Sequence, residues 1–306
     1  MEDNETNKEM KLRGFRSCVA TAMQTVFGNI TGLIKGIWKM LLPLTVILAI
    51  IHTCFDCIMP GIMYVGFEFH GIQLMIISVL SFVANFLAYV LAYSIVNKQG
   101  IAWNLKRLLW LLPINVAFAI MFVLLGIAAS FIYAYLSKDP AQIPLLSIIA
   151  IFLLTAPVAV IFCLPMMFVN CRYMMEPKLK LRKSFGESYA AGMRSWGFIF
   201  ATYFAASLCS MIIATVLCSP AIIINTVLNV SSYGTAAYGD PSGLPSYLVP
   251  LDFVVSLYTS AIYITLLLFI TYTGYYVYQT VSCKLIARNE RKNMLSETTE
   301  KEMNSL

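Results

Sequence analysis

The stretch Trp38-KMLLPLTVILAIIHTCFDCI-Met59 decides the fold of this chain. Its charged side chains are Lys39, next to its beginning, and Asp56, close to its end. The run is too long for a β-strand, and about 20 apolar residues are what an α-helix needs to cross the hydrocarbon core of a bilayer. We therefore predict a membrane-spanning helix here.

Five further apolar runs along the rest of the chain predict membrane-spanning helices in the same way. They lie at 71–96, 108–136, 143–170, 196–225 and 248–283. Of the 306 residues, 59% are hydrophobic and 12% are charged, and soluble domains carry about twice that charged fraction. We expect an all-α polytopic membrane helix bundle, with six transmembrane helices arranged as three hairpins.

This layout divides the chain into three expected parts. Residues 1–37 form a cytoplasmic N-terminus with an interfacial amphipathic helix, 38–283 form the six-helix transmembrane domain, and 284–306 form a charged cytoplasmic tail. From residue 289 onward we expect disorder. The polar stretch 229–247 is rich in Ser, Gly, Tyr and Pro, which predicts a turn-rich outer loop.

The basic residues predict the orientation. Of the 21 Lys and Arg residues, only Lys138 falls in a connector on the predicted outer side. The others fall at the N-terminus, at the very start of the first span (Lys39), in alternate connectors and after the sixth span. Because basic residues favour the cytoplasmic side during insertion, we expect a multi-pass protein of a cell membrane with both termini in the cytoplasm. The net charge of +6 then favours anionic lipid as a partner, not nucleic acid.

Each inward-starting span opens with a tryptophan near basic residues, which makes Trp38, Trp110 and Trp196 predicted interfacial anchors. Leu-Leu-Pro follows the first two of them. A preference of Trp and basic residues for the interface explains the pattern, and so does a threefold repeat of hairpins.

Amphipathic segments precede two of these spans. Between Phe15 and Ile37, apolar residues recur at steps of three or four, as on one face of a single helix lying in the interface plane. A second apolar stripe precedes the fifth span and comprises Leu181, Phe185, Tyr189, Met193 and Trp196.

A basic cluster adjoins the second stripe. It consists of Lys178, Lys180, Arg182 and Lys183. At headgroup height, each of these can gain about 1 kcal/mol from anionic lipid. The cluster is therefore a candidate headgroup site, although its charges could instead act only as orientation signals during insertion.

The strongest candidate for metal or redox chemistry is the group His52, Cys54, Asp56 and Cys57. These are metal-ligand residue types, and the two cysteines have a CxxC spacing. On a helix, however, His52 and Asp56 share a face and Cys54 points elsewhere. We therefore favour interfacial polar residues with two buried thiols, and we predict neither a metal site nor a cofactor.

The middles of the predicted spans contain no Lys, Arg, Asp or Glu. Asp56 and Asp252 fall at outer helix ends, where we expect them to reach water. Since intramembrane ionisable residues mark ion pathways, ion-coupled transport is not expected. Asn85 is the clearest polar residue near a bilayer midplane. Such a residue could line a pathway, but a hydrogen bond across a helix interface is the favoured interpretation.

The basic lead-ins, together with Lys183-Ser-Phe-Gly and Arg194-Ser-Trp-Gly before the fifth span, carry a resemblance. The chain resembles a group of uncharacterised six-span bacterial integral membrane proteins. It is also similar in layout to the membrane domain that precedes some glycerophosphodiester phosphodiesterases. The resemblance implies a helical protein of the bacterial cytoplasmic membrane, and no catalytic residues carry over because the phosphodiesterase domain is absent.

No catalytic motif is present in the sequence, so we expect a non-enzymatic protein that organises lipid or a partner protein, including a second copy of itself, at the cytoplasmic leaflet. The alternative is a transporter or channel for small or apolar solutes that is not coupled to ions. An intramembrane enzyme that uses His52 and Asp56 is the least favoured class.

Overall fold

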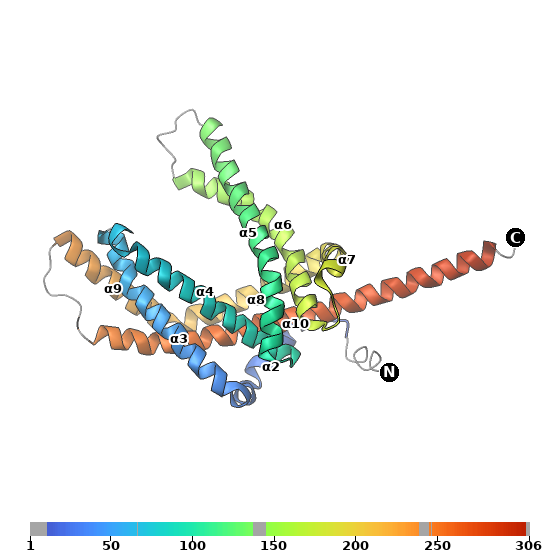
Figure 1. The fold of residues 1–306 in the computed structure, drawn as a ribbon, viewed down its shortest axis with the longest axis horizontal. Coiled ribbons are helices and arrows are strands. Elements are labelled where there is room, and N and C mark those ends of the chain that lie inside the picture. Colours follow the sequence, from blue (N-terminus) through green and yellow to red (C-terminus); the bar gives the residue numbers. More distant parts are fainter. Residues whose placement is uncertain (1–10, 66, 137–144, 239–244, 246, 304–306) are drawn as a thin grey trace. The chain divides into compact units, whose positions relative to one another are not determined.

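The computed structural model describes residues 11–65, 67–136, 145–238, 245 and 247–303, and every regular element in those ranges is a helix (Figure 1). The helices are α2 (Phe15–Phe27), α3 (Ile30–Val65), α4 (Phe67–Asn97), α5 (Ile101–Leu136), α6 (Leu145–Met175), α7 (Leu181–Arg194), α8 (Trp196–Leu217), α9 (Ser219–Tyr238) and α10 (Leu248–Met303). Lys138 lies outside the described residues.

The chain divides into two compact units. Unit 1 comprises residues 1–19, 102–203 and 273–306, and unit 2 comprises residues 20–101 and 204–272. Both α8 and α10 contribute residues to each unit. The expected division at residues 37 and 283 does not coincide with any helix end, because α3 and α10 run through these positions.

Five helical segments in the described residues are long and apolar enough to cross a membrane. They are Trp38–Ile58, Gly71–Asn97, Ile101–Ala128, Trp196–Leu217 and Leu248–Arg291. Many of their large side chains are exposed, such as Ile72, Met75 and Val79 on α4, as expected of a surface in contact with hydrocarbon. The chain is an all-α, multi-pass membrane protein. In the region of the expected fourth span, α6 is helical and includes the shorter apolar segment Val160–Met175.

Prolines do not end the helices in which they occur. Helix α5 continues through Pro113, and α6 continues through both Pro157 and Pro165. In a membrane protein, neighbouring helices and side chains can satisfy the backbone groups that a proline leaves unpaired, which is why an unbroken helix is tolerated here.

The expected fifth span, 196–225, is wrong as a single helix, because it divides into α8 and α9 at Cys218. Pro220 has no N–H and cannot donate to the carbonyl of Val216. The hydroxyl of Ser219 donates to that carbonyl instead, at 3.0 Å. A local side-chain hydrogen bond therefore replaces the missing backbone bond at the break.

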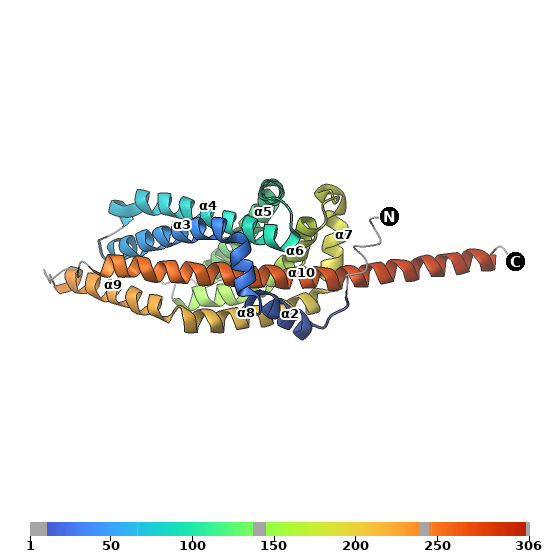
Figure 2. The ribbon, with the colours of Figure 1, turned by 90° about the horizontal axis from the view of Figure 1, so that it is seen from below.

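Two segments expected to be irregular are helical. Helix α9 continues to Tyr238, inside the predicted outer loop, and α10 continues to Met303, inside the predicted disordered tail. No Gly or Pro follows Gly274 in α10, and its later residues are mostly good helix formers such as Glu, Lys, Arg and Met. Figure 2 shows α10 as one continuous helix.

The first amphipathic lead-in is two helices, not one. Helix α2 ends at Phe27 and α3 begins at Ile30. The residues between them, Gly28 and Asn29, are both poor helix formers. Within the predicted stripe, Val19, Ala22 and Val26 are buried by the protein itself.

Unit 2 is built around α3. This helix packs against α4 and α9, and Leu48, Val90 and Leu228 are among the fully buried side chains. Asn85 of α4 accepts a hydrogen bond from the hydroxyl of Tyr263 in α10 at 2.6 Å. Asn85 therefore bridges two helices of this unit.

In unit 1, α7 packs closely on α6. A Cβ atom placed on Gly192 would lie 3.0 Å from the Cα and 3.1 Å from the carbonyl oxygen of Pro165. On α10, a Cβ at Gly274 would lie 2.7 Å from the hydroxyl of Tyr203. Small residues allow such close approach of membrane helices.

Candidate functional site

The basic cluster predicted from the sequence lies where α6 passes into α7. Helix α6 ends at Met175, two residues before Pro177, because a residue that precedes proline disfavours the helical conformation. A tight turn follows, in which the N–H of Leu179 donates to the carbonyl of Glu176 at 3.1 Å. We refer to residues 176–180 as the connector.

Arg107 of α5 holds the connector in place. Its guanidinium donates to the carbonyl oxygens of Glu176 at 2.7 Å, Pro177 at 3.0 Å and Leu179 at 2.8 Å, and also to that of Tyr173. The side chain is 8% exposed. The carbonyl of Tyr173 belongs to the last turn of α6, which leaves its carbonyls without intrahelical partners. The other three carbonyls belong to the connector. Arg107 therefore caps α6 and fixes the path of the chain beyond it.

Aromatic rings enclose the same guanidinium. Its central carbon lies 4.5 Å from the ring centroid of Trp103 and 4.1 Å from that of Tyr173. Contacts of this kind are cation–π interactions, and they strengthen when water is excluded. Arg107 is thus fully engaged inside the protein.

Glu176 joins the connector to helices α6 and α10. Its Oε1 accepts from Nε of Arg172 at 3.1 Å and from the hydroxyl of Tyr278 in α10 at 3.0 Å. Arg172 also donates to the buried Ser188 of α7 at 3.1 Å. Helices α6, α7 and α10 therefore meet at the connector.

The predicted basic cluster lies along the connector and the first turn of α7. Lys178, Lys180 and Arg182 are exposed, and Lys183 follows in the same turn. Lys180 is the N-cap residue of α7 and makes no side-chain capping hydrogen bond, since its ammonium group has no acceptor atom. The first N–H groups of a helix and its dipole favour an anion at this position.

The apolar stripe of α7 is only partly covered. The inward face of the helix is made by Ser188, Ala191 and Gly192, all buried. Phe185 and Tyr189 stack with ring centroids 6.0 Å apart and stay half-exposed. Burial raises the pKa of the Tyr189 phenol above its ordinary value, and its hydroxyl donates to the carbonyl of Phe162 at 3.3 Å.

The predicted tryptophan anchors differ in exposure. Trp38 is 53% exposed and Trp110 is 63% exposed, so the protein itself covers neither ring fully. Trp196 is half-buried and stacks on Phe200 with ring centroids 5.2 Å apart.

The His52 group separates onto two sides of α3. His52 Nδ1 lies 3.4 Å from the hydroxyl of Ser260, and Asp56 accepts from Asn225 at 3.4 Å. Cys54 and Cys57 are exposed, so the expectation that both thiols are buried is wrong. Within the described residues, no three His, Cys, Asp or Glu side chains are placed to hold a metal ion together.

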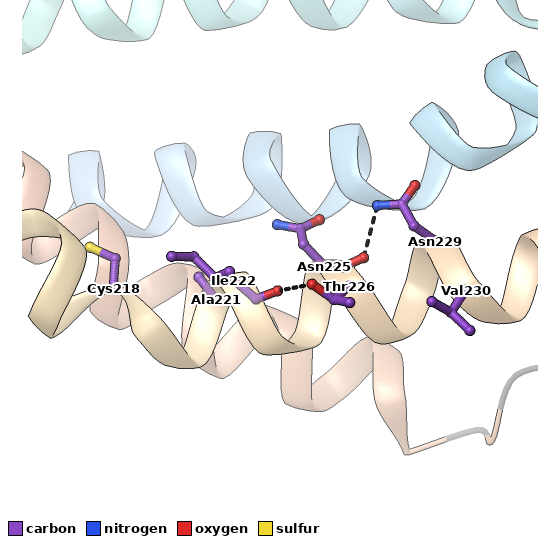
Figure 3. A pocket seen from close by; sticks show the side chains of 7 residues that line it. All are labelled: Cys218, Ala221, Ile222, Asn225, Thr226, Asn229 and Val230. Atoms are coloured by element: carbon purple, nitrogen blue, oxygen red, sulfur yellow. Dashed lines mark hydrogen bonds between the residues drawn. The ribbon is translucent and has the colours of Figure 1, made fainter.

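A shallow depression of about 440 Å³ is lined by Cys218, which precedes α9, and by residues of α9 (Figure 3). Asn225 and Asn229 are on its polar side, and the amide of Asn229 donates to the carbonyl of Asn225 at 2.8 Å. A shallow hollow along one helix and the residue before it encloses no ligand. It therefore adds nothing to the choice of function.

Comparison of the chain with known protein families, with characterised proteins and with solved structures gave no match. The site is therefore interpreted from its own geometry. Sequence reasoning located the basic cluster and the stripe of α7 but missed the role of Arg107. In the sequence Arg107 is simply one more basic residue at the start of a span.

Proposed function

We propose that this protein binds anionic phospholipid at the cytoplasmic leaflet, through the connector and the first turn of α7. The observation that supports this most directly is the hold of Arg107 on the connector. Because the backbone is fixed, Lys178, Lys180 and Arg182 are presented together with an N-terminus of α7 that has no side-chain cap. A phosphate group would then meet a preformed site and not a flexible loop.

The proposal assigns separate parts of the lipid to separate parts of the site. The phosphate is bound by the basic side chains and the first N–H groups of α7. The acyl chains lie along the half-exposed Phe185 and Tyr189. Such a protein needs no catalytic residue and no cofactor, and we propose a non-enzymatic role.

Changing Lys178, Lys180, Arg182 and Lys183 together to Gln is expected to lower co-purification of anionic lipid roughly tenfold or more, because each basic residue contributes about 1 kcal/mol at modest salt. The wild-type protein should lose the same lipid as salt rises. Lipid is measured by mass spectrometry of protein extracted in mild detergent.

A matched control changes Arg288, Arg291, Lys292 and Lys301 of α10 to Gln. Both variants lower the net charge from +6 to +2. The control should keep its lipid. Equal loss from both variants, or no loss from the connector variant, would refute a specific site.

We also propose the six-span topology of a bacterial cytoplasmic membrane protein, with both termini inside. Reporter fusions after residues 65, 140 and 238 should be located outside, and fusions after 100, 185 and 295 inside. The charge distribution supports this orientation. A single inverted fusion would contradict it.

A transporter or channel for small or apolar solutes is the second candidate. The polar face inside unit 2, with His52, Asp56 and Asn225, favours it. Solute uptake by reconstituted protein that is lost in Asn225→Leu and kept in the connector variant would select this function over lipid binding.

A further inference from the structure

The residue that fits its surroundings least well is Asp252, in the first turns of α10. It is 2% exposed, and its Oδ2 has no hydrogen-bond partner among the described residues. The sequence suggested that this carboxylate reaches water, and that expectation is wrong. Burying a charged group without compensation is costly inside a protein and more so inside a membrane.

A second buried polar atom without a partner lies beside it. Thr53 of α3 adjoins Asp252, and its side chain is 9% exposed. No hydrogen bond within 3.5 Å joins them, and the Thr53 hydroxyl has no other partner among the described side chains. Most Thr and Ser hydroxyls in membrane helices can bond to the preceding turn, so Thr53 is an exception that requires a reason.

The surroundings are rich in oxygen atoms. Ser256 and Ser260 are 4% and 0% exposed and follow Asp252 at intervals of one helical turn, on the same face of α10. The charge of Asp252 also acts on His52 and Asp56 of α3. All of these residues belong to unit 2.

The basic residues of unit 2 cannot neutralise the negative charge of Asp252 and Asp56. Its sequence contains only Lys35, Lys39 and Lys98. Lys39 is about 20 Å from Thr53 along the axis of α3. Lys98 directly follows α4, at the end of the α3–α4 hairpin where α3 begins. The buried carboxylate of Asp252 and the half-buried carboxylate of Asp56 therefore lie near each other without a cationic side chain of their own unit.

We propose that Asp252 and Thr53 bind a small cation, such as Na⁺, between α3 and α10. The carboxylate of Asp252, the neighbouring hydroxyls and the nearby carboxylate of Asp56 make a set of oxygen ligands, which suits hard cations. The ion supplies the missing positive charge and occupies both unpartnered oxygen atoms. This site is independent of the connector.

The test is thermal unfolding of the purified protein in detergent, with NaCl compared with choline chloride at equal ionic strength. A rise of about 5 °C in the Tm is expected when Na⁺ exceeds its Kd roughly 100-fold. The rise should disappear in Asp252→Asn. It should persist in Asn85→Ala, which removes a hydrogen bond of unit 2 outside the cation site.

Thr53→Val is a second test variant, for use if the Asp252→Asn protein does not fold. It removes one oxygen ligand without changing the charge, and should raise the half-saturating Na⁺ concentration several-fold. A response to CaCl₂ in place of NaCl, lost in the same variants, would support the site and identify the ion as divalent. If neither salt raises the Tm of the wild type, or if Asp252→Asn responds as the wild type does, the proposal is wrong.

Discussion

Replacing Arg107 with alanine is expected to lower the free energy of unfolding by about 3 kcal/mol or more, because it removes four hydrogen bonds made by a buried charged group, and such bonds contribute about 1.5–3 kcal/mol each. The carbonyls concerned belong to Tyr173, Glu176, Pro177 and Leu179. The change also removes the cation that contacts Trp103 and Tyr173. Thermal or denaturant unfolding in detergent measures the effect.

Arg107→Lys separates charge from geometry. A lysine keeps the charge but lacks the planar fork that serves several acceptors at once, so we expect it to recover only part of the loss. Lys106→Ala is the matched control, since Lys106 precedes Arg107 and is exposed. It should change stability by less than about 0.5 kcal/mol.

The Arg107→Ala variant also links stability to the proposed function. With the connector released, Arg107→Ala keeps all four residues of the basic cluster, yet it should retain less anionic lipid than the wild type. Full lipid retention by a folded Arg107→Ala protein would show that the fixed connector is unimportant for binding.

Gly192→Leu is expected to destabilise unit 1 by about 1–3 kcal/mol, the usual effect of forcing extra atoms into a packed contact. The Cβ would meet the Cα of Pro165 at 3.0 Å and its carbonyl oxygen at 3.1 Å. Both are backbone atoms, so no side chain can move aside to relieve the clash. Proteolysis of the α6–α7 region, together with thermal unfolding, reports the separation of the two helices.

Gly186→Leu on the same helix is its control. A Cβ at Gly186 meets nothing within 4 Å, and leucine is a better helix former than glycine by up to about 1 kcal/mol. We therefore expect equal or higher stability. Similar losses from both substitutions would mean that α7 is sensitive to any bulk and not to its contact with Pro165.

The sequence by itself determined the class of protein. Uninterrupted apolar runs such as Trp38–Ile58 and Gly71–Asn97 are sufficient to predict membrane helices, because a bilayer requires a fixed length of apolar helix. The 3.6-residue period predicted α7, and the clustering of Lys178, Lys180, Arg182 and Lys183 could be read directly. These features depend on neighbours along the chain, and so sequence patterns reveal them.

Helix boundaries were predicted less well. The break at Cys218 and the end of α2 depend on single residues, Pro220 and Gly28, whose effect varies with the partners that are available locally. The charged composition beyond residue 289 predicted disorder. The segment is instead helical to Met303, because most of its residues have a high helix propensity.

Only the tertiary structure decided which side chains meet. Glu176 of the connector follows Arg107 by 69 positions in the chain, and Thr53 and Asp252 are farther apart still. A basic residue at a membrane interface and one that caps a distant helix look the same in sequence. The burial of Asp252 was likewise not predictable, because an acidic residue near a helix end reaches water or not according to the helices that pack around it.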